Sequence, residues 1–352
     1  MNFSKASSSG ALALAVALSL GGCGSQAAES SLPALSLDPA RVSVVGLSSG
    51  AAMAQQAHFA FSDRLIGAGL IAGPPYGCAE GDLGTALGRC MKGEPDAPDA
   101  VKLAERAREL ADAGKIAPLS GLDGDRVWVL HGASDATVKE PVTRASYAIY
   151  EALQREVAQP PVAGMKLVWD AQRDIGHAWP TVDKGVACAT TEAPFIAACG
   201  FDAAQAMLEA LYGAAPRAVA DAAGGQVLAF NQDAYRPAGE DAYLADEGFL
   251  YVPPQCVQDT RCGAVIAFHG CEQNAASLDR QFVDDNGLNR WADAHDLVVV
   301  YPQARASFMP LNPKACWDWW GYSGAGYDTR DGRQLAWLAG LTAALGIPLD
   351  AR

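Results

Sequence analysis

The chain has 352 residues, of which 50% are hydrophobic, and its formal net charge at pH 7 is -14. This length and composition suit one large α/β domain or two small ones, with enough apolar residues for a sizeable core. The acidic balance argues against nucleic acid and anionic membranes as partners and favours a neutral substrate.

The first 22 residues resemble an export signal and do not belong to the fold. A lysine is followed by an apolar stretch, residues 11–20, which is too short to span a bilayer. It ends in Leu-Gly-Gly before Cys23, a pattern that resembles a bacterial lipoprotein signal with Cys23 as the lipidated residue. Cleavage after Ala27 is the alternative. Either way we expect an exported protein, extracellular or an outer-membrane or periplasm-facing lipoprotein. Residues 23–36 are typical of a flexible tether.

A nucleophile elbow is predicted at the start of the folded part. A β-branched run at residues 42–45 enters the motif Gly-x-Ser-x-Gly at residues 46–50, and a helix-forming sequence follows. Strand, sharp turn and helix are the context that such an elbow requires. Ser48 is therefore the candidate nucleophile, and the backbone N–H of Ser49 is a candidate oxyanion donor. The competing interpretation is an ordinary strand-to-helix turn.

Beyond the elbow, the sequence predicts strands and helices in alternation. Strands are expected at residues 65–72, 125–130, 165–169, 226–230, 248–252, 264–268 and 297–301. Helices are expected at 99–115, 141–157, 201–212, 278–294 and 334–345, with a stapled loop at 73–97, a connector at 214–224 and a Trp-rich loop at 315–328. Apolar strands alternating with helices predict an α/β fold, with a mostly parallel sheet covered on both faces.

A serine nucleophile needs a base and an orienting carboxylate. Of the five histidines, His131 and His269 begin tight turns after strands, so we expect both to shape their loops. His58 and His295 fall on predicted helices, where we expect solvated or capping roles. His177 is left as the candidate base, in a Gly-His-x-Trp-Pro loop that follows a strand.

Asp135 is the preferred acid because it follows the strand at 125–130 in a tight loop. Asp174 is the second candidate, but it lies too near His177 along the chain to orient its ring. For each carboxylate, the alternative is a surface loop residue. The order Ser48, Asp135, His177 matches the α/β-hydrolase order of nucleophile, acid and base.

The second oxyanion donor is expected in the loop after the strand at 264–268, as the backbone N–H of Cys271; a plain turn with a structural cysteine is the alternative. In an α/β-hydrolase this loop normally precedes the nucleophile, whereas here it lies about 220 residues later. Residues 37–41 and 349–352 also resemble each other. We interpret this order as a circular permutation with its seam just before the nucleophile strand. It predicts that strands 42–46 and 264–268 are neighbours in the middle of the sheet.

Nine cysteines fit an oxidising compartment, and eight remain when Cys23 is set aside. Their spacings do not resemble a zinc site, and the chain has no phosphate-loop motif, so we expect no metal and no cofactor. Eight cysteines allow about a hundred pairings, so the connectivity stays open. Pairing of neighbours along the chain favours Cys78–Cys90, Cys188–Cys199, Cys256–Cys262 and Cys271–Cys316.

Six motifs together resemble the esterase family of extracellular poly(3-hydroxybutyrate) depolymerases, most closely its circularly permuted, single-domain type. They are the elbow, His-Gly-x-x-Asp at 131–135, Gly-His-Ala-Trp-Pro at 176–180, His-Gly-Cys-x-Gln at 269–273, Tyr-Pro-Gln at 301–303 and Cys-Trp-Asp-Trp-Trp at 316–320. The resemblance covers about residues 37–352 and implies one permuted α/β-hydrolase catalytic domain. It places the triad on Ser48, Asp135 and His177, and the oxyanion donors on Ser49 and Cys271.

Three functions compete at this point. The first is a serine esterase that hydrolyses poly(3-hydroxybutyrate) or related hydroxyalkanoate polyesters and oligomers through an acyl-enzyme. The second is a carbohydrate esterase, such as a feruloyl or acetyl-xylan esterase, because related folds share the Trp-rich loop. The third is a non-catalytic exported binding lipoprotein, which a complete triad disfavours. We expect a monomer, with a lipid anchor through Cys23 as its contact with a membrane.

The Trp-rich loop is predicted to contact substrate. A Cys271–Cys316 bond would pin the oxyanion backbone and hold Trp317, Trp319 and Trp320 at the rim of the site. Flat aromatic walls suit a repeating aliphatic ester with few polar groups. We expect Trp317 to make the contact and one or two of the three to be core residues. The aspartate between them predicts a partly exposed loop.

Overall fold

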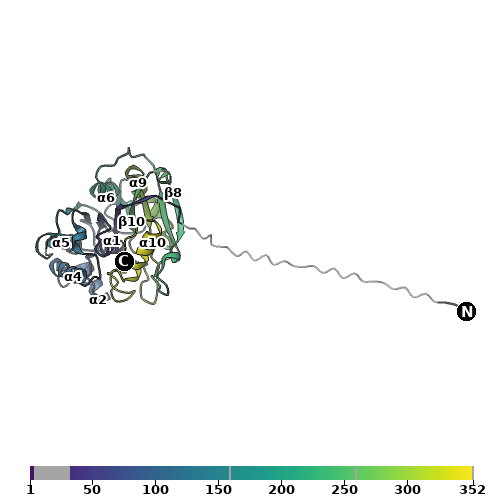
Figure 1. The fold of residues 1–352 in the computed structure, drawn as a ribbon, viewed down its shortest axis with the longest axis horizontal. Coiled ribbons are helices and arrows are strands. Elements are labelled where there is room, and N and C mark those ends of the chain that lie inside the picture. Colours follow the sequence, from purple (N-terminus) through teal and green to yellow (C-terminus); the bar gives the residue numbers. More distant parts are fainter. Residues whose placement is uncertain (4–31, 158–159, 258–259, 351–352) are drawn as a thin grey trace.

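The computed structural model describes residues 1–3, 32–157, 160–257 and 260–350 (Figure 1). Cys23 and nearly all of the expected signal peptide lie outside these residues. Of the expected tether, residues 32–36 are described, and Leu32 and Leu35 pack against the core. Within the described ranges, no helix has both the length and the apolar composition needed to cross a bilayer.

An eight-stranded sheet runs through the centre of the described residues in the order β4-β3-β2-β1-β10-β11-β9-β8. Neighbouring strands from β4 to β11 pair in parallel, and β9 pairs antiparallel with both β11 and β8. The predicted mostly parallel sheet is therefore confirmed. The strand bounds are β1 Leu37–Leu47, β2 Gly67–Ile71, β3 Arg126–Gly132, β4 Lys166–Arg173, β8 Gln226–Asn231, β9 Glu247–Val252, β10 Cys262–Phe268 and β11 Leu297–Tyr301.

The elbow strand β1 lies between β2 and β10 and is parallel to both. Val44 is opposite Ile266, and Gly46 is opposite Phe268. The predicted pairing of these two strands, so distant in sequence, is confirmed. Because parallel strands end at the same edge of a sheet, the elbow after β1 and the loop after β10 open at one place.

Both faces of the sheet are apolar in its middle, where alternate residues of a strand belong to different cores. In β1, Val42 and Val44 belong to one core, whereas Val45 and Leu47 belong to the other. The first core is covered by α1 Ser49–Ala60, α4 Ala100–Asp112, α5 Glu140–Ala152 and α10 Arg333–Ala344. The second is covered by α6 Ala203–Tyr212, α8 Gln281–Asp285 and α9 Leu288–His295 (Figure 1).

The single helix predicted at 278–294 is wrong. The segment forms α7 Ala275–Leu278, α8 and α9, separated by two breaks. At the first break, Asp279 has a positive φ of 50°. At the second, Gly287 has φ 83°, and the Asn286 side chain accepts the Leu288 N–H at 2.8 Å. Asn and Gly side by side therefore stop one helix and start the next, which apolar spacing alone does not reveal.

Smaller elements surround the edge of the sheet where the elbow opens. The stapled loop at 73–97 contains two short helices, α2 Leu83–Leu87 and α3 Arg89–Lys92. A small parallel sheet, in the order β5-β7-β6, begins directly after the His177 loop. The remaining elements are β5 Trp179–Thr181, β6 Val186–Ala187, β7 Ile196–Ala198 and the helical turns η1 Leu119–Leu122, η2 Leu153–Val157, η3 Gln232–Tyr235 and η4 Pro254–Val257.

Candidate active site

Ser48 occupies the strained turn that a nucleophile elbow requires. Its φ of 58° and ψ of -121° are a conformation that L-residues rarely adopt, and its backbone N–H donates to the Ile71 carbonyl at 2.8 Å. A Cβ on Gly46 would collide with the backbone of Gly50. A Cβ on Gly50 would collide with the carbonyl of Phe268, at the end of β10. The two glycines therefore allow the tight turn and the close approach of β10 to it.

His177 and Asp135 meet at this edge of the sheet. The His177 Nδ1 lies 2.7 Å from Asp135 Oδ2, and their side chains are 7% and 0% exposed. The other carboxylate oxygen, Oδ1, accepts the backbone N–H groups of Thr137 and Val138 at 2.8 and 3.0 Å. A carboxylate held on both oxygens can fix the imidazole with its proton on Nδ1, which leaves Nε2 free to accept one.

The second acid candidate has a different partner. Asp174 accepts a hydrogen bond from the Ser134 hydroxyl at the exposed side of the loop. His131 holds its own loop, because its Nε2 lies 3.1 Å from the Val138 carbonyl. The structure thus brings His177 together with Asp135, while Asp174 bonds to the neighbouring serine.

The expectation that His58 and His295 are solvated is wrong, since these residues are 0% and 1% exposed. His58 lies on α1, which is buried along its whole length and so has no solvated face. Its Nε2 lies 2.9 Å from Asp125 Oδ2, and its Nδ1 lies 2.9 Å from the Tyr150 hydroxyl. Burial raises the pKa of Asp125 and that of Tyr150. These three side chains form a polar cluster inside the fold. Asp125 directly precedes the start of β3, whereas Ser48 follows the end of β1, so the cluster and Ser48 lie at opposite ends of the parallel strands.

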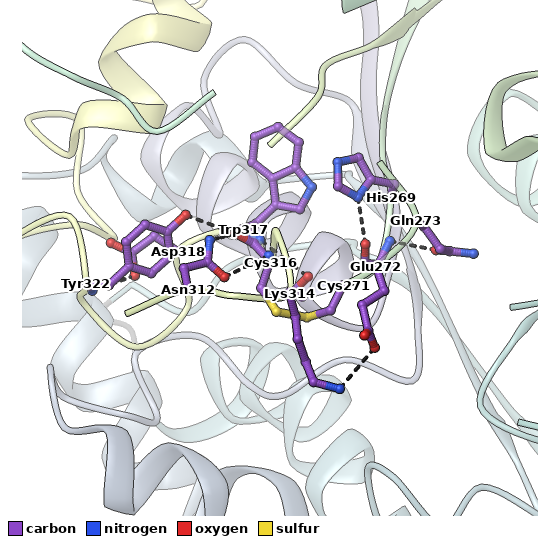
Figure 2. The surroundings of a disulfide bond; sticks show 12 residues. His269, Cys271, Glu272, Gln273, Asn312, Lys314, Cys316, Trp317, Asp318 and Tyr322 are labelled. Atoms are coloured by element: carbon purple, nitrogen blue, oxygen red, sulfur yellow. Dashed lines mark hydrogen bonds and ion pairs between the residues drawn. A yellow bond between two sulfur atoms is a disulfide. The ribbon is translucent and has the colours of Figure 1, made fainter. Parts of the chain in front are cut away.

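Four disulfides tie the loops together. The structure contains the bonds Cys78–Cys90, Cys188–Cys199, Cys256–Cys262 and Cys271–Cys316. These are the predicted pairings, in which each cysteine bonds to its neighbour in the sequence. Three of them close short loops. The fourth joins positions 45 residues apart and attaches the loop after β10 to the Trp-rich loop (Figure 2).

Ser48, Ser49, His177 and Cys271 all line one cavity of about 500 Å³. Its walls are mainly aliphatic and aromatic, which suits a ligand with few polar groups. The apolar side chains of these walls are Leu47, Leu83, Leu87, Met91, Val138, Phe195, Leu311, Trp319 and Trp320. Within the described ranges, no group of three or more His, Cys, Asp or Glu residues is placed to hold a metal ion.

Sequence reasoning missed most of these walls. Leu83 and Leu87 are four residues apart on α2, a spacing that puts them on one helix face. This spacing, inside a loop that contains two cysteines, is the sequence signal from which an apolar helix face at the cavity could have been predicted. Phe195 and Leu311 carry no comparable signal, because each lies in irregular backbone whose course depends on distant contacts.

The expectation that Trp317 contacts substrate is wrong. Its side chain is 0% exposed, does not line the cavity, and packs edge-to-face on Phe268 with ring centroids 5.0 Å apart. Trp319 and Trp320 do line the cavity. The Trp-rich loop thus brings two of its three tryptophans to the cavity wall.

The carboxylate of Asp318 explains the orientation of the loop. Asp318 itself is buried, at 2% exposed, while residues 324–326 are exposed and give the loop the partial exposure that was expected. Its oxygens accept the backbone N–H groups of Gly321, Tyr322 and Ser323 at 2.6, 3.0 and 2.8 Å. The loop folds around this buried carboxylate and so turns Trp317 toward the core.

Comparison with known proteins shows which family this chain resembles. The family described as Esterase PHB depolymerase matches residues 247–343. A poly(3-hydroxybutyrate) depolymerase of Delftia acidovorans is 36% identical over 339 residues, which cover 95% of this chain and 64% of that protein's length. A polyhydroxybutyrate depolymerase of Talaromyces funiculosus is 31% identical over 331 residues, with 90% of this chain and 92% of the relative covered.

Two solved structures share the fold. One is a PHB depolymerase with a serine replaced by alanine, complexed with R3HB trimer; it is 27% identical, with a TM-score of 0.77 over 91% of this chain and 98% of that one. The PHB depolymerase from Penicillium funiculosum is 28% identical, with the same TM-score and the same coverage. The agreement in sequence and fold over nearly the whole described chain shows that this protein belongs to the PHB depolymerase family of esterases.

Proposed function

We propose that this chain is a serine esterase that hydrolyses poly(3-hydroxybutyrate) or related hydroxyalkanoate polyesters and oligomers through an acyl-enzyme. The observation that carries the proposal is the His177–Asp135 contact of 2.7 Å, with His177 lining the same cavity as the strained Ser48. The serine-to-alanine relative complexed with R3HB trimer supports both the nucleophile type and the substrate class.

Each residue of the site has a defined step in this reaction. Ser48 Oγ attacks the ester carbonyl carbon while His177 Nε2 takes its proton, and Asp135 stabilises the imidazolium. The backbone N–H groups of Ser49 and Cys271 bind the oxyanion of the tetrahedral intermediate. His177 then returns the proton to the leaving hydroxyl, and a water molecule repeats the sequence on the acyl-enzyme.

The cavity walls favour a polyester over a carbohydrate ester. A sugar carries many hydroxyl groups, each of which costs free energy if it is buried without a hydrogen-bond partner. Thr137, Thr191, Glu272, Gln273, Asn312 and Lys314 also line this cavity, but four leucines, Met91, Phe195 and two tryptophans give it extended apolar walls. A hydroxyalkanoate chain presents methyl and methylene groups to such walls and needs polar partners mainly at the ester being cleaved.

Exposed apolar residues beside the cavity provide the test on polymer. Phe308 and Met309 are 87% and 92% exposed, and Leu311 of the same loop lines the cavity. Burial of two such side chains on a solid polyester contributes about 1.5–3 kcal/mol each, so a double variant with Phe308→Ser and Met309→Ser should clear a poly(3-hydroxybutyrate) suspension at least about tenfold more slowly. Its rate on a short soluble ester should change less than about twofold, because such an ester does not reach the loop tip.

The control is Val257→Ser, which removes an exposed apolar side chain, 68% exposed, outside the cavity walls. It should leave both rates unchanged. Assays on feruloyl and acetyl-xylan esters, run beside the polymer assay, test the alternative function of a carbohydrate esterase. Faster turnover of either carbohydrate ester than of polyester would favour the carbohydrate esterase.

We also propose that residues 37–352 form one circularly permuted catalytic domain that acts as a monomer. The support is the order of the parts: the oxyanion strand β10 follows the nucleophile strand β1 by most of the chain and yet pairs with it directly. All the residues to which we assign a step lie in one chain and line one cavity or contact its walls.

Export and anchoring complete the proposal. We expect removal of residues 1–22 and lipidation of Cys23, and four disulfides in one chain fit an oxidising compartment. Mass spectrometry of the protein purified from a bacterial host should find Cys23 as the modified first residue, and Cys23→Ala should abolish the modification. An unmodified N-terminus at Ala28 would instead support ordinary secretion.

A further inference from the structure

The acid loop, residues 133–139, is held by a lysine of the stapled loop. Lys92 ends α3, and its ammonium group donates to the carbonyl oxygens of Ala136 and Thr137 at 2.9 and 3.0 Å. These two residues directly follow Asp135. We propose that Lys92 is a positioning residue of the triad, which acts through two peptide bonds on the Asp135 carboxylate. The inference rests on the proposed serine-esterase function.

The two peptide bonds within residues 136–138 connect Lys92 to Asp135. Their carbonyl groups both accept from the Lys92 ammonium. Their N–H groups, which belong to Thr137 and Val138, both donate to Asp135 Oδ1, at 2.8 and 3.0 Å. In a planar trans peptide the carbonyl and the N–H point in opposite directions. Each peptide therefore has the ammonium group at its negative end and the carboxylate at its positive end.

This arrangement strengthens the hold on the carboxylate. Hydrogen bonds in one chain polarise one another, and bonds to an ionised group are roughly twice as strong as those between neutral groups. Here one ammonium group begins both chains and one carboxylate ends both, and the Asp135 side chain is 0% exposed. With Oδ1 fixed, the plane of the carboxylate is fixed too, which keeps Oδ2 at 2.7 Å from His177 Nδ1.

The backbone around Lys92 is tied to the acid loop. Cys90, two residues earlier on α3, forms the disulfide with Cys78. On the other side, the Lys139 N–H donates to the Met91 carbonyl at 2.9 Å. Because the backbones already meet beside Lys92, reaching the two carbonyls orders only the lysine side chain. The stapled loop thus gains a role besides its leucines in the cavity wall.

Lys92 stands behind the cavity rather than in it. It is half-buried and does not line the cavity, although its neighbour Met91 and its partner Thr137 do. A side chain that contacts substrate affects KM, whereas one that acts only through the triad affects kcat. The separation of kcat from KM is therefore the first readout of the role of Lys92.

Two substitutions at Lys92 isolate its charge and its bonds. Lys92→Met removes both but keeps a flexible side chain, whereas Lys92→Arg keeps the charge and has donors for both carbonyls. The matched control is Lys102→Met, the same change at a lysine of α4 whose side chain is 80% exposed. All variants are assayed on a short soluble ester, with kcat referred to active Ser48 titrated by a fluorophosphonate.

We expect Lys92→Met to lose about 10- to 100-fold in kcat with KM within about threefold, the range typical of hydrogen-bond partners that orient metal-binding side chains. Lys92→Arg should stay within about fivefold of the parent, because the charge and the donors remain. Lys102→Met should stay within about twofold, as for most changes at an exposed position.

A double-mutant cycle with Asp135→Asn separates positioning from general support of the fold. If Lys92 acts through the Asp135 carboxylate, Lys92→Met should lower kcat by less than about twofold once residue 135 is Asn. A lysine that only supports the fold would cost the same in both backgrounds. Thermal unfolding of every variant shows that the kcat values belong to folded proteins.

Three results would overturn the inference: a folded Lys92→Met with kcat within about twofold of the parent, a loss confined to KM, or the same loss in the Asp135→Asn background. Equal losses in Lys92→Met and Lys92→Arg would also do so. If Lys92→Met does not fold, Lys92→Gln replaces it, since glutamine lacks the charge and can donate to only one carbonyl at a time; a fully active Lys92→Gln would equally overturn the role.

The same assay on Ser48→Ala keeps the two claims apart. Full activity of Ser48→Ala would remove the proposed function. Inactive Ser48→Ala together with a fully active Lys92→Met would remove only the role of Lys92.

Discussion

Ser48→Ala should lower kcat on every ester substrate by about 10⁴-fold or more, because the variant can form no acyl-enzyme. The alanine methyl group fits the space of the serine Cβ, and the elbow that holds it depends on Gly46 and Gly50, so the fold should remain. The measurement is kcat on a soluble ester, together with thermal unfolding to show that the variant is intact.

The neighbouring serine provides the matched control. Ser49 is proposed to act through its backbone N–H, and its hydroxyl accepts only a long hydrogen bond, 3.4 Å, from the Trp317 N–H. Ser49→Ala keeps that backbone N–H and should retain kcat within about tenfold. A Ser48→Ala variant as active as Ser49→Ala would show that the elbow is only a structural turn.

Asp135→Asn should lower kcat by about 10⁴-fold with little change in KM. The amide can donate a proton toward His177 Nδ1, where the carboxylate accepts one at 2.7 Å. The imidazole would then carry its proton on Nε2 and could no longer accept the proton of Ser48. The backbone N–H groups of Thr137 and Val138 still find an amide oxygen, so the loop should keep its shape.

Asp174→Asn is the control for this prediction, since it makes the same chemical change three residues before His177. Asp174 contacts the Ser134 hydroxyl, so its loss should change kcat less than about tenfold. Measured kcat values for the two variants, taken from initial rates on one soluble ester, give a direct comparison. A larger loss in Asp174→Asn than in Asp135→Asn would exchange the roles of the two carboxylates.

The elbow could be read from the sequence because its constraints are local. Gly46 and Gly50 are required by atoms within a few residues of Ser48 or by the one strand beside it. Strands β10 and β11 and the second half of β1, residues 42–47, could also be predicted, because each is a short, mostly apolar run buried on both faces. Chain order and elimination selected Asp135 and His177, and the structure places these two side chains in contact.

The errors share one physical cause. Whether Trp317 faces the cavity or the core depends on Asp318, whose carboxylate collects the backbone N–H groups of residues 321–323 and folds the loop inward. The burial of His58 depends on α1 being covered from every side. Neither property is encoded in the spacing of neighbouring residues, since both arise from segments that meet only after folding.

The sequence by itself thus determined the parallel sheet, the nucleophile turn and the family, because short runs and fixed glycines carry that information. Only the tertiary structure decided which side chains form the cavity walls, which tryptophan is core, and how the Gly270–Cys271 peptide is held. The bond from His269 to the Gly270 carbonyl depends on the placement of a ring buried between Trp317 and Phe282. Contacts between residues so far apart along the chain are set by packing, which sequence periodicity does not specify.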